Sequence, residues 1–209
     1  MVMGKRFFGS VNLPIFSFST AVQAVLVWKY GRRMDGLRIF KKLTLRDIAW
    51  LGGIMLYLLL ILLVASSYLN FPEPQTEYLL NDSLWGVVCI VFKHMFTLEF
   101  WELWIRKALN TGFVEEVAFR GLVQNFLEKR YGKKIWILAL ASAIFGITHL
   151  GHGAHSLVNP LCWNWPYIIL STIAGLGFGL IYRKTGALSY SIAAHAAIDR
   201  ITRTLFLMR

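Results

Sequence analysis

The clearest candidate for a membrane span is the apolar run over residues 48–71, which has no charged side chain, and it restricts the fold more than any other feature. A helix needs about 20 mostly apolar residues to cross the hydrocarbon core of a bilayer, so this run can span a membrane. The composition agrees, because 56% of the 209 residues are hydrophobic and only 16% are charged. Soluble domains carry about 25% charged residues. The sequence therefore predicts an integral membrane protein.

Other apolar segments follow one another along the chain with short polar connections between them. They cover residues 11–28, 84–105, 111–128, 135–150, 166–182 and 187–208. The N-terminus lacks the pattern of a cleaved signal peptide, so the first of these segments is expected to be retained. We expect an all-α fold, a multi-pass transmembrane bundle of about six to eight helices. Residues 1–209 are expected to form a single integral membrane domain.

The net charge of +11 comes from basic residues in short blocks between the apolar segments. Residues 29–46 contain seven Lys or Arg and one Asp, and residues 129–134 form a second basic block. Such blocks are typical of cytoplasmic loops beside the membrane, so nucleic acid is not an expected partner. Residues 72–82 are acidic and should lie on the outer side.

The two basic blocks pose a problem of orientation. Both lie on one side of the membrane only if an even number of helices crosses between them. Three apolar segments, 48–71, 84–105 and 111–128, separate the blocks. Either the ambiguous segment 84–105 does not cross, or one basic turn lies outside.

Two adjacent carboxylates and an arginine, Glu115, Glu116 and Arg120, interrupt the apolar segment 111–128. Charges are costly in hydrocarbon, so these side chains should face the protein interior and find partners there. Glu116 and Arg120 are four residues apart, which places them on one helix face as an internal ion pair. Glu115 points about 100° away from Glu116 and can face another helix.

Three more ionisable residues, His149, His195 and Asp199, occupy apolar segments. Glu115 and His149 lie seventeen residues before and after Gly132. In an antiparallel hairpin with a rise of about 1.5 Å per residue, both reach roughly 25 Å from the turn. His195 and Asp199 are four apart and share a helix face. The sequence therefore predicts that a carboxylate and an imidazole meet at one level of the bundle.

This set of residues suits two kinds of chemistry. A carboxylate and a histidine can hold and deprotonate one water molecule, and a second histidine with a polar neighbour can stabilise an oxyanion. Two histidines and a carboxylate also form a common zinc shell. Residue types alone leave both mechanisms open. His152 and His155 extend the histidine spacing but fall in a Gly-rich loop, where we do not expect metal ligands.

The polar residues form three motifs in order, each on an apolar segment. They are Glu115-Glu116-x-x-x-Arg120, Phe145-x-x-x-His149 and His195-x-x-x-Asp199. Together they resemble the signature of the CAAX-protease and bacteriocin-processing family of intramembrane proteases, also called the Abi family. The resemblance covers about residues 110–200.

The resemblance implies a glutamate-dependent intramembrane endopeptidase that hydrolyses a peptide bond of a membrane-associated peptide or protein. By analogy Glu115 and His149 activate the water, while His195 and Asp199 form the oxyanion site. No cofactor is expected, and zinc is the alternative. Asp199 stands where the prenyl-protein members have Asn. Since an aspartate donates only when protonated, Asp199 could instead orient His195.

Two other classes of function compete with the protease. A non-catalytic membrane adaptor or bacteriocin-immunity protein could keep the fold and the polar core. A transporter would also use buried charges, but the chain has no internal duplication or paired broken helices. The expected partners are a peptide or protein substrate, the lipid bilayer and a membrane partner protein. The expected location is the cell membrane of a bacterium or archaeon.

Overall fold

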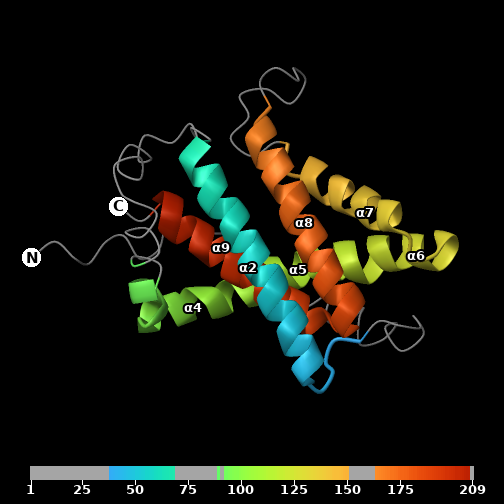
Figure 1. Ribbon diagram of the computed structural model, residues 1–209, viewed down its shortest axis with the longest axis horizontal. Helices are drawn as coiled ribbons and strands as arrows, with labels where there is room; N and C mark the ends of the chain where they lie inside the picture. Colours follow the sequence, from blue (N-terminus) through green and yellow to red (C-terminus); the bar gives the residue numbers. More distant parts are fainter. Residues whose placement is uncertain (1–37, 69–88, 90–91, 151–162, 208–209) are drawn as a thin grey trace, which may run out of the picture.

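The structure, a computed structural model, describes residues 38–68, 89, 92–150 and 163–207 (Figure 1). All regular secondary structure in these residues is helical, which confirms the all-α fold. The expected segment 11–28 and the acidic loop 72–82 lie outside the described residues. The helices are α2 (Leu45–Tyr68), α4 (Leu98–Lys107), η2 (Ala108–Gly112), α5 (Phe113–Glu116), η3 (Val117–Gln124), α6 (Asn125–Tyr131), α7 (Ile135–Ile147), α8 (Trp165–Thr185) and α9 (Leu188–Leu207).

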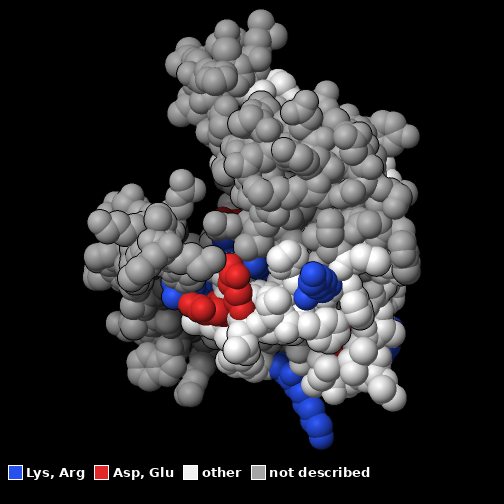
Figure 2. Space-filling view, turned by 90° about the vertical axis from the view of Figure 1, so that its left-hand side faces the viewer, with Lys and Arg blue, Asp and Glu red and all other residues white. Residues whose placement is uncertain are grey.

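Two of the described helices are long and apolar enough to cross a membrane. They are α2, through Leu45–Leu62, and α8, through Trp165–Thr185. Large apolar side chains such as Leu56 and Leu60 on α2 and Ile169 on α8 are more than half exposed, as expected of surfaces that contact lipid. Figure 2 shows the α4 side of the molecule, where the described surface is mostly uncharged and acidic side chains gather in one small cluster. Crossings by further helices stay a prediction.

One continuous helix runs from Leu98 to Tyr131 through α4, η2, α5, η3 and α6, with helical backbone angles at every junction. The expected division between segments 84–105 and 111–128 is therefore wrong. The charges that suggested a connection are neutralised within the protein: Arg106 pairs with Glu102 at 2.7 Å, and Lys107 with Asp199 at 3.3 Å. Residues 98–105 of the first segment and residues 111–128 of the second therefore belong to one helix.

Helix α8 lies between α2 on one side and α7 on the other (Figure 1). A buried apolar cluster joins α8 to α2 and α9. Its members are Ile54, Leu58, Leu62, Phe178, Ile181, Ala194 and Ile198. Gly186, with a φ of 72°, ends α8 and allows the sharp reversal into α9.

Glycines on α8 allow close helix packing on two sides. A Cβ atom on Gly177 would lie 2.8 Å from the Leu58 side chain of α2. On the other face, a Cβ atom on Gly179 would lie 2.5 Å from the Leu138 side chain of α7, and one on Gly175 would lie 3.0 Å from the Phe145 ring. Small residues thus bring the backbone of α8 within reach of polar side chains on neighbouring helices.

Candidate active site

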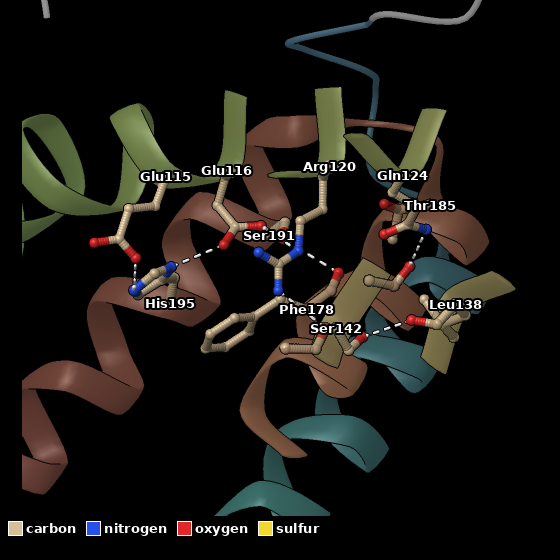
Figure 3. A network of polar contacts seen from close by, with 12 residues as sticks. Glu115, Glu116, Arg120, Gln124, Leu138, Ser142, Phe178, Thr185, Ser191 and His195 are labelled. Carbon is tan, nitrogen blue, oxygen red and sulfur yellow. Dashed lines mark hydrogen bonds and ion pairs between the residues drawn. The ribbon is translucent and has the colours of Figure 1, made fainter. Parts of the chain in front are cut away.

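The π-helical segment η3 aligns a row of polar side chains on one buried face. Glu116, Arg120, Gln124 and Glu128 are spaced by four residues, which in a regular α-helix rotates each about 40° past the last. The wider turns of a π-helix oppose that drift. Glu116, Arg120 and Gln124 are at most 2% exposed. Figure 3 shows these three pointing to the same side of their helix.

Glu116 and Arg120 form the ion pair that the sequence predicted, with 3.1 Å between Arg120 Nε and Glu116 Oε2. Arg120 Nη2 donates to the Gly175 carbonyl of α8 at 2.9 Å. The guanidinium also lies over the Phe145 ring, 4.5 Å from its centroid. Three helices therefore fix this buried pair.

Glu116 has a second role that the sequence analysis missed, because it also holds His195. His195 Nδ1 lies 2.8 Å from Glu116 Oε1 (Figure 3). A carboxylate paired with Arg120 accepts hydrogen bonds, so Nδ1 is assigned the proton and Nε2 points the other way. The imidazole is stacked on the Phe178 ring, with centroids 4.7 Å apart.

Ser191 is another residue that the sequence analysis missed. Its hydroxyl donates to Glu116 Oε2 and lies 3.1 Å from the Phe178 carbonyl. Ser191 precedes His195 by four residues, so the two share a face of α9. That spacing from a motif histidine is the one sequence signal that could have identified it.

Glu115 faces the two histidines rather than the arginine. Its Oε2 atom lies 3.7 Å from His195 Nε2 and 3.9 Å from His149 Nε2. This oxygen is buried and has no hydrogen-bond partner among the described residues. His149 Nδ1 lies 2.9 Å from the Phe145 carbonyl, which can only accept, so in neutral His149 the Nε2 lone pair faces Glu115. The meeting of Glu115 and His149 at one depth agrees with the hairpin prediction.

Asp199 completes the group from the next turn of α9. Its Oδ1 atom lies 3.7 Å from His195 Nε2, and its Oδ2 atom lies 3.3 Å from Lys107 Nζ. Lys107 was not among the site residues predicted from the sequence. Lys107 and Glu115 are eight residues apart, about 80° around a regular helix, and the π-helical segment η2 between them reduces that angle.

The structure thus brings together all four residues predicted for catalysis, from α5, the end of α7 and α9. The distances of 3.7–3.9 Å between them exceed those of direct hydrogen bonds. The donor types suit zinc, yet among the described residues no group of three or more His, Cys, Asp or Glu side chains lies close enough to hold a metal ion as placed. His152 and His155 lie outside the described residues.

The residues of this site lie in a region that matches a known protein family. A family model described as "Type II CAAX prenyl endopeptidase Rce1-like" matches residues 97–201, which is half of the chain and includes every motif residue. The chain belongs to the Rce1-like endopeptidase family. Comparisons with curated proteins and with solved structures give no match. Membership in the Rce1-like family makes the protein a protease by class and supports the membrane assignment.

The Rce1-like region coincides with structural landmarks. It begins at Thr97, whose hydroxyl accepts from Phe100 N at 3.2 Å and caps α4, and it ends within α9. Helix α2 precedes the matched region but contributes to the core against α8 and α9. The fold around the site therefore uses both halves of the chain.

The charges of this Rce1-like site nearly balance. Three carboxylates, Glu115, Glu116 and Asp199, face two cations, Arg120 and Lys107. With neutral histidines the formal sum is one negative charge. An imidazolium at His195 would balance it, because carboxylates lie near both of its ring nitrogens.

Proposed function

We propose that the protein is a glutamate-dependent intramembrane endopeptidase that hydrolyses a peptide bond of a membrane-associated peptide or protein. The observation that carries this proposal is the separation of 3.9 Å between Glu115 Oε2 and His149 Nε2. One water molecule with hydrogen bonds of about 2.8 Å to each would bridge that separation. Both atoms can accept a hydrogen bond, so the lone pairs of the bridging water stay free to attack.

In the proposed reaction Glu115 accepts a proton from this water as the oxygen attacks the carbonyl carbon of the substrate. The carbonyl oxygen becomes an oxyanion, to which His195 in its imidazolium form donates the Nε2 proton in a hydrogen bond. Glu115 then gives its proton to the leaving nitrogen as the C–N bond breaks. The products are a carboxylic acid and an amine.

Glu116 and Arg120 are assigned a supporting role. Their buried pair fixes the helix that carries Glu115, and Glu116 orients His195 through Nδ1. The proposal places the enzyme as a multi-pass protein in the cell membrane of a bacterium or archaeon. It needs no cofactor, and zinc is the alternative that the experiment must separate.

The test is peptide cleavage by purified protein in lipid vesicles, with wild type, Glu115→Gln and His149→Ala side by side. Glu102→Gln and His94→Ala are matched controls, because the Glu102 side chain is 54% exposed and pairs with Arg106, and His94 lies before the start of α4. Each protein is assayed with and without a chelator and added zinc.

Cleavage that is lost in the two site variants, kept in the controls and unaffected by chelator would support the water mechanism. Loss on chelation that zinc restores would replace it with a metalloprotease. Undiminished cleavage in both site variants would end the assignment. If a partner-dependent cellular function survives Glu115→Gln, the adaptor class gains support instead.

A further inference from the structure

Three basic segments that are far apart in the sequence lie at one end of the helices. They are residues 38–46 at the start of α2, residues 129–134 between α6 and α7, and Arg183 with Lys184 at the end of α8. Lys184 Nζ lies 4.3 Å from the ring centroid of Trp50 on α2. Arg183 Nη2 donates to the Lys134 carbonyl at 3.2 Å. These contacts join the three segments into one surface, here called the basic face.

Two acidic residues next to the basic face, Asp47 and Glu128, do not neutralise it. Asp47 is buried and pairs with Lys41 at 3.2 Å, and Glu128 pairs with Arg183 at 2.8 Å. The remaining cations of the basic face are exposed; they are Arg38, Lys42, Arg46, Lys129, Arg130, Lys133, Lys134 and Lys184.

The opposite ends of α2 and α7 lead into segments of different charge. In the sequence, residues 69–88 and 151–162 together contain three acidic residues and no Lys or Arg. Aromatic side chains border the basic face, since Trp50, Tyr131 and Trp136 are 38%, 49% and 51% exposed. Aromatic residues gather at the level of lipid headgroups, so this border marks where the membrane surface meets the protein.

We propose that the basic face is the cytoplasmic end of the protein and binds the headgroups of anionic phospholipids. Clusters of Lys and Arg next to a membrane helix attract anionic lipids, and positive segments are kept on the cytoplasmic side. The continuous helix Leu98–Tyr131 removes the earlier conflict of orientation. Among the described residues, two long helices, α2 and this one, separate the basic blocks 38–46 and 129–134. The proposal has both of them cross the membrane, which places both blocks on one side.

Lipid binding is tested by thermal unfolding in detergent with added phosphatidylglycerol or phosphatidylcholine. The wild type is expected to gain several degrees more from phosphatidylglycerol, and high salt should reduce the difference. A variant with Lys129, Arg130, Lys133 and Lys134 all changed to Gln should lose at least half of it. Equal stabilisation by both lipids, or an unchanged difference in the variant, would overturn the lipid site.

Orientation is tested by a membrane-impermeant maleimide on bacterial cells that express single-cysteine proteins. Cys89 and Cys162 are replaced by Ser, and a cysteine is placed by Tyr131→Cys at the basic face or Trp165→Cys at the other end of α8. The first is expected to react only after permeabilisation and the second in intact cells. The reverse pattern would overturn the orientation.

A second observation concerns the site itself and rests on the proposed function. Lys107 Nζ lies 3.3 Å from Asp199 Oδ2, while Asp199 Oδ1 lies 3.7 Å from His195 Nε2. Glu116 already occupies the other nitrogen of His195 at 2.8 Å. Glu115 and Asp199 both lie 3.7 Å from His195 Nε2, the atom that would bind the oxyanion, and Lys107 is the cation that balances Asp199.

We infer that Lys107 is a positioning residue that holds Asp199 in place and offsets its charge beside the reacting centre. Without Lys107, the free Asp199 carboxylate would repel the developing oxyanion and compete for the Nε2 proton of His195. Lys107 touches neither substrate nor water in this scheme. Its effect should therefore fall on kcat rather than KM.

The test compares Lys107→Met, Lys107→Arg, Asp199→Asn and the double variant Lys107→Met/Asp199→Asn in the cleavage assay. Lys107→Met should lower kcat about tenfold with KM little changed, and Lys107→Arg should keep most of the activity. The double variant should be no slower than Asp199→Asn alone, because no unbalanced carboxylate remains. Wild-type kinetics in Lys107→Met, or independent losses that multiply in the double variant, would overturn the inference.

The experiments distinguish a failure of the Lys107 inference from a failure of the proposed function. If wild type cleaves and Glu115→Gln does not, the proposed function stands whatever Lys107 does. Unchanged cleavage in Glu115→Gln would remove the proposed function first. The lipid and orientation tests need no catalytic activity.

Discussion

The two halves of the polar site differ in how completely their atoms are bonded. In the buried network, Glu116, Arg120 and Ser191 are at most 2% exposed and hold His195 Nδ1 at 2.8 Å. In the open cluster, Glu115, His149 and Asp199 have side chains that are 19–29% exposed, and the distances between site atoms are 3.7–3.9 Å. Adjacent residues, Glu115 and Glu116, thus stand in opposite environments.

This difference in bonding suggests that the buried network supports the structure of the site, while the open cluster carries out the reaction. A carboxylate whose oxygens are all bonded has no spare capacity to bind a substrate or a water molecule, and it serves to fix its neighbours. A carboxylate oxygen that lies beyond hydrogen-bond distance of its neighbours can exchange a proton with a bound molecule. Substitutions in the two halves should therefore affect different quantities.

The largest effect on activity is expected from Glu115→Gln. Loss of a general base typically lowers rates by about 10²–10⁴-fold. The amide keeps the size of the carboxylate, and its site is partly exposed, so the unfolding midpoint should stay close to that of wild type. Cleavage and thermal unfolding are measured on the same preparation. A variant that unfolds early but retains its rate would contradict the comparison.

Glu116→Gln should have the largest effect on stability. It leaves Arg120 as an uncompensated buried charge, which costs about 3–5 kcal/mol. Unfolding in a denaturant series in mild detergent provides the measurement. Activity should fall as well, because a neutral amide replaces the carboxylate that pairs with His195 at Nδ1. Equal unfolding free energies for Glu116→Gln and Glu115→Gln would contradict the distinction between the buried network and the open cluster.

Gly179→Ala tests the close packing that supports the buried network. The added Cβ atom would meet the Leu138 side chain at 2.5 Å and the Gln124 side-chain oxygen at 2.7 Å. Overpacking of this kind costs about 1–3 kcal/mol. Gly53→Ala is the matched control, because nothing lies within 4 Å of its Cβ position and alanine favours a helix. Equal unfolding free energies for the two variants would refute the packing argument.

Ser191→Ala removes one hydroxyl from the buried network. The loss of its hydrogen bond to Glu116 should cost about 1–2 kcal/mol, less than removal of a charge. The measurement is again the unfolding free energy, and cleavage at saturating substrate serves as a second readout. Ser191→Thr, which keeps the hydroxyl, should recover part of the loss. No difference between the alanine and threonine variants would mean that the hydroxyl has no role.

The smallest effect is expected for the exposed pair Glu102 and Arg106, which lies on the same long helix at 2.7 Å. Exposed pairs at this spacing contribute about 0.3–0.5 kcal/mol. Glu102→Gln should therefore change stability by no more than this and leave cleavage unaltered. A larger loss of stability would show that the loss of a charge, and not its burial, determines how strongly a substitution destabilises the protein.

Much of the site could be predicted from the sequence. Charged residues in apolar segments must face the interior, and spacings of four and seventeen residues placed Glu116 with Arg120 and Glu115 with His149. The spacing could not show that Glu116 also holds His195, because that contact joins α5 to α9 across 79 residues. Lys107 was missed because its charge resembled a connection between helices.

The sequence by itself determined the helical, apolar character of the chain and the identity of its motif residues. Both follow from local composition and periodicity, which need no knowledge of neighbours. Only the tertiary structure decided that Leu98–Tyr131 is one helix, that its π-helical turns align the polar row, and that three basic segments share one end. These features depend on contacts between helices that are distant in the chain, and a charge is satisfied or exposed only according to what packs against it.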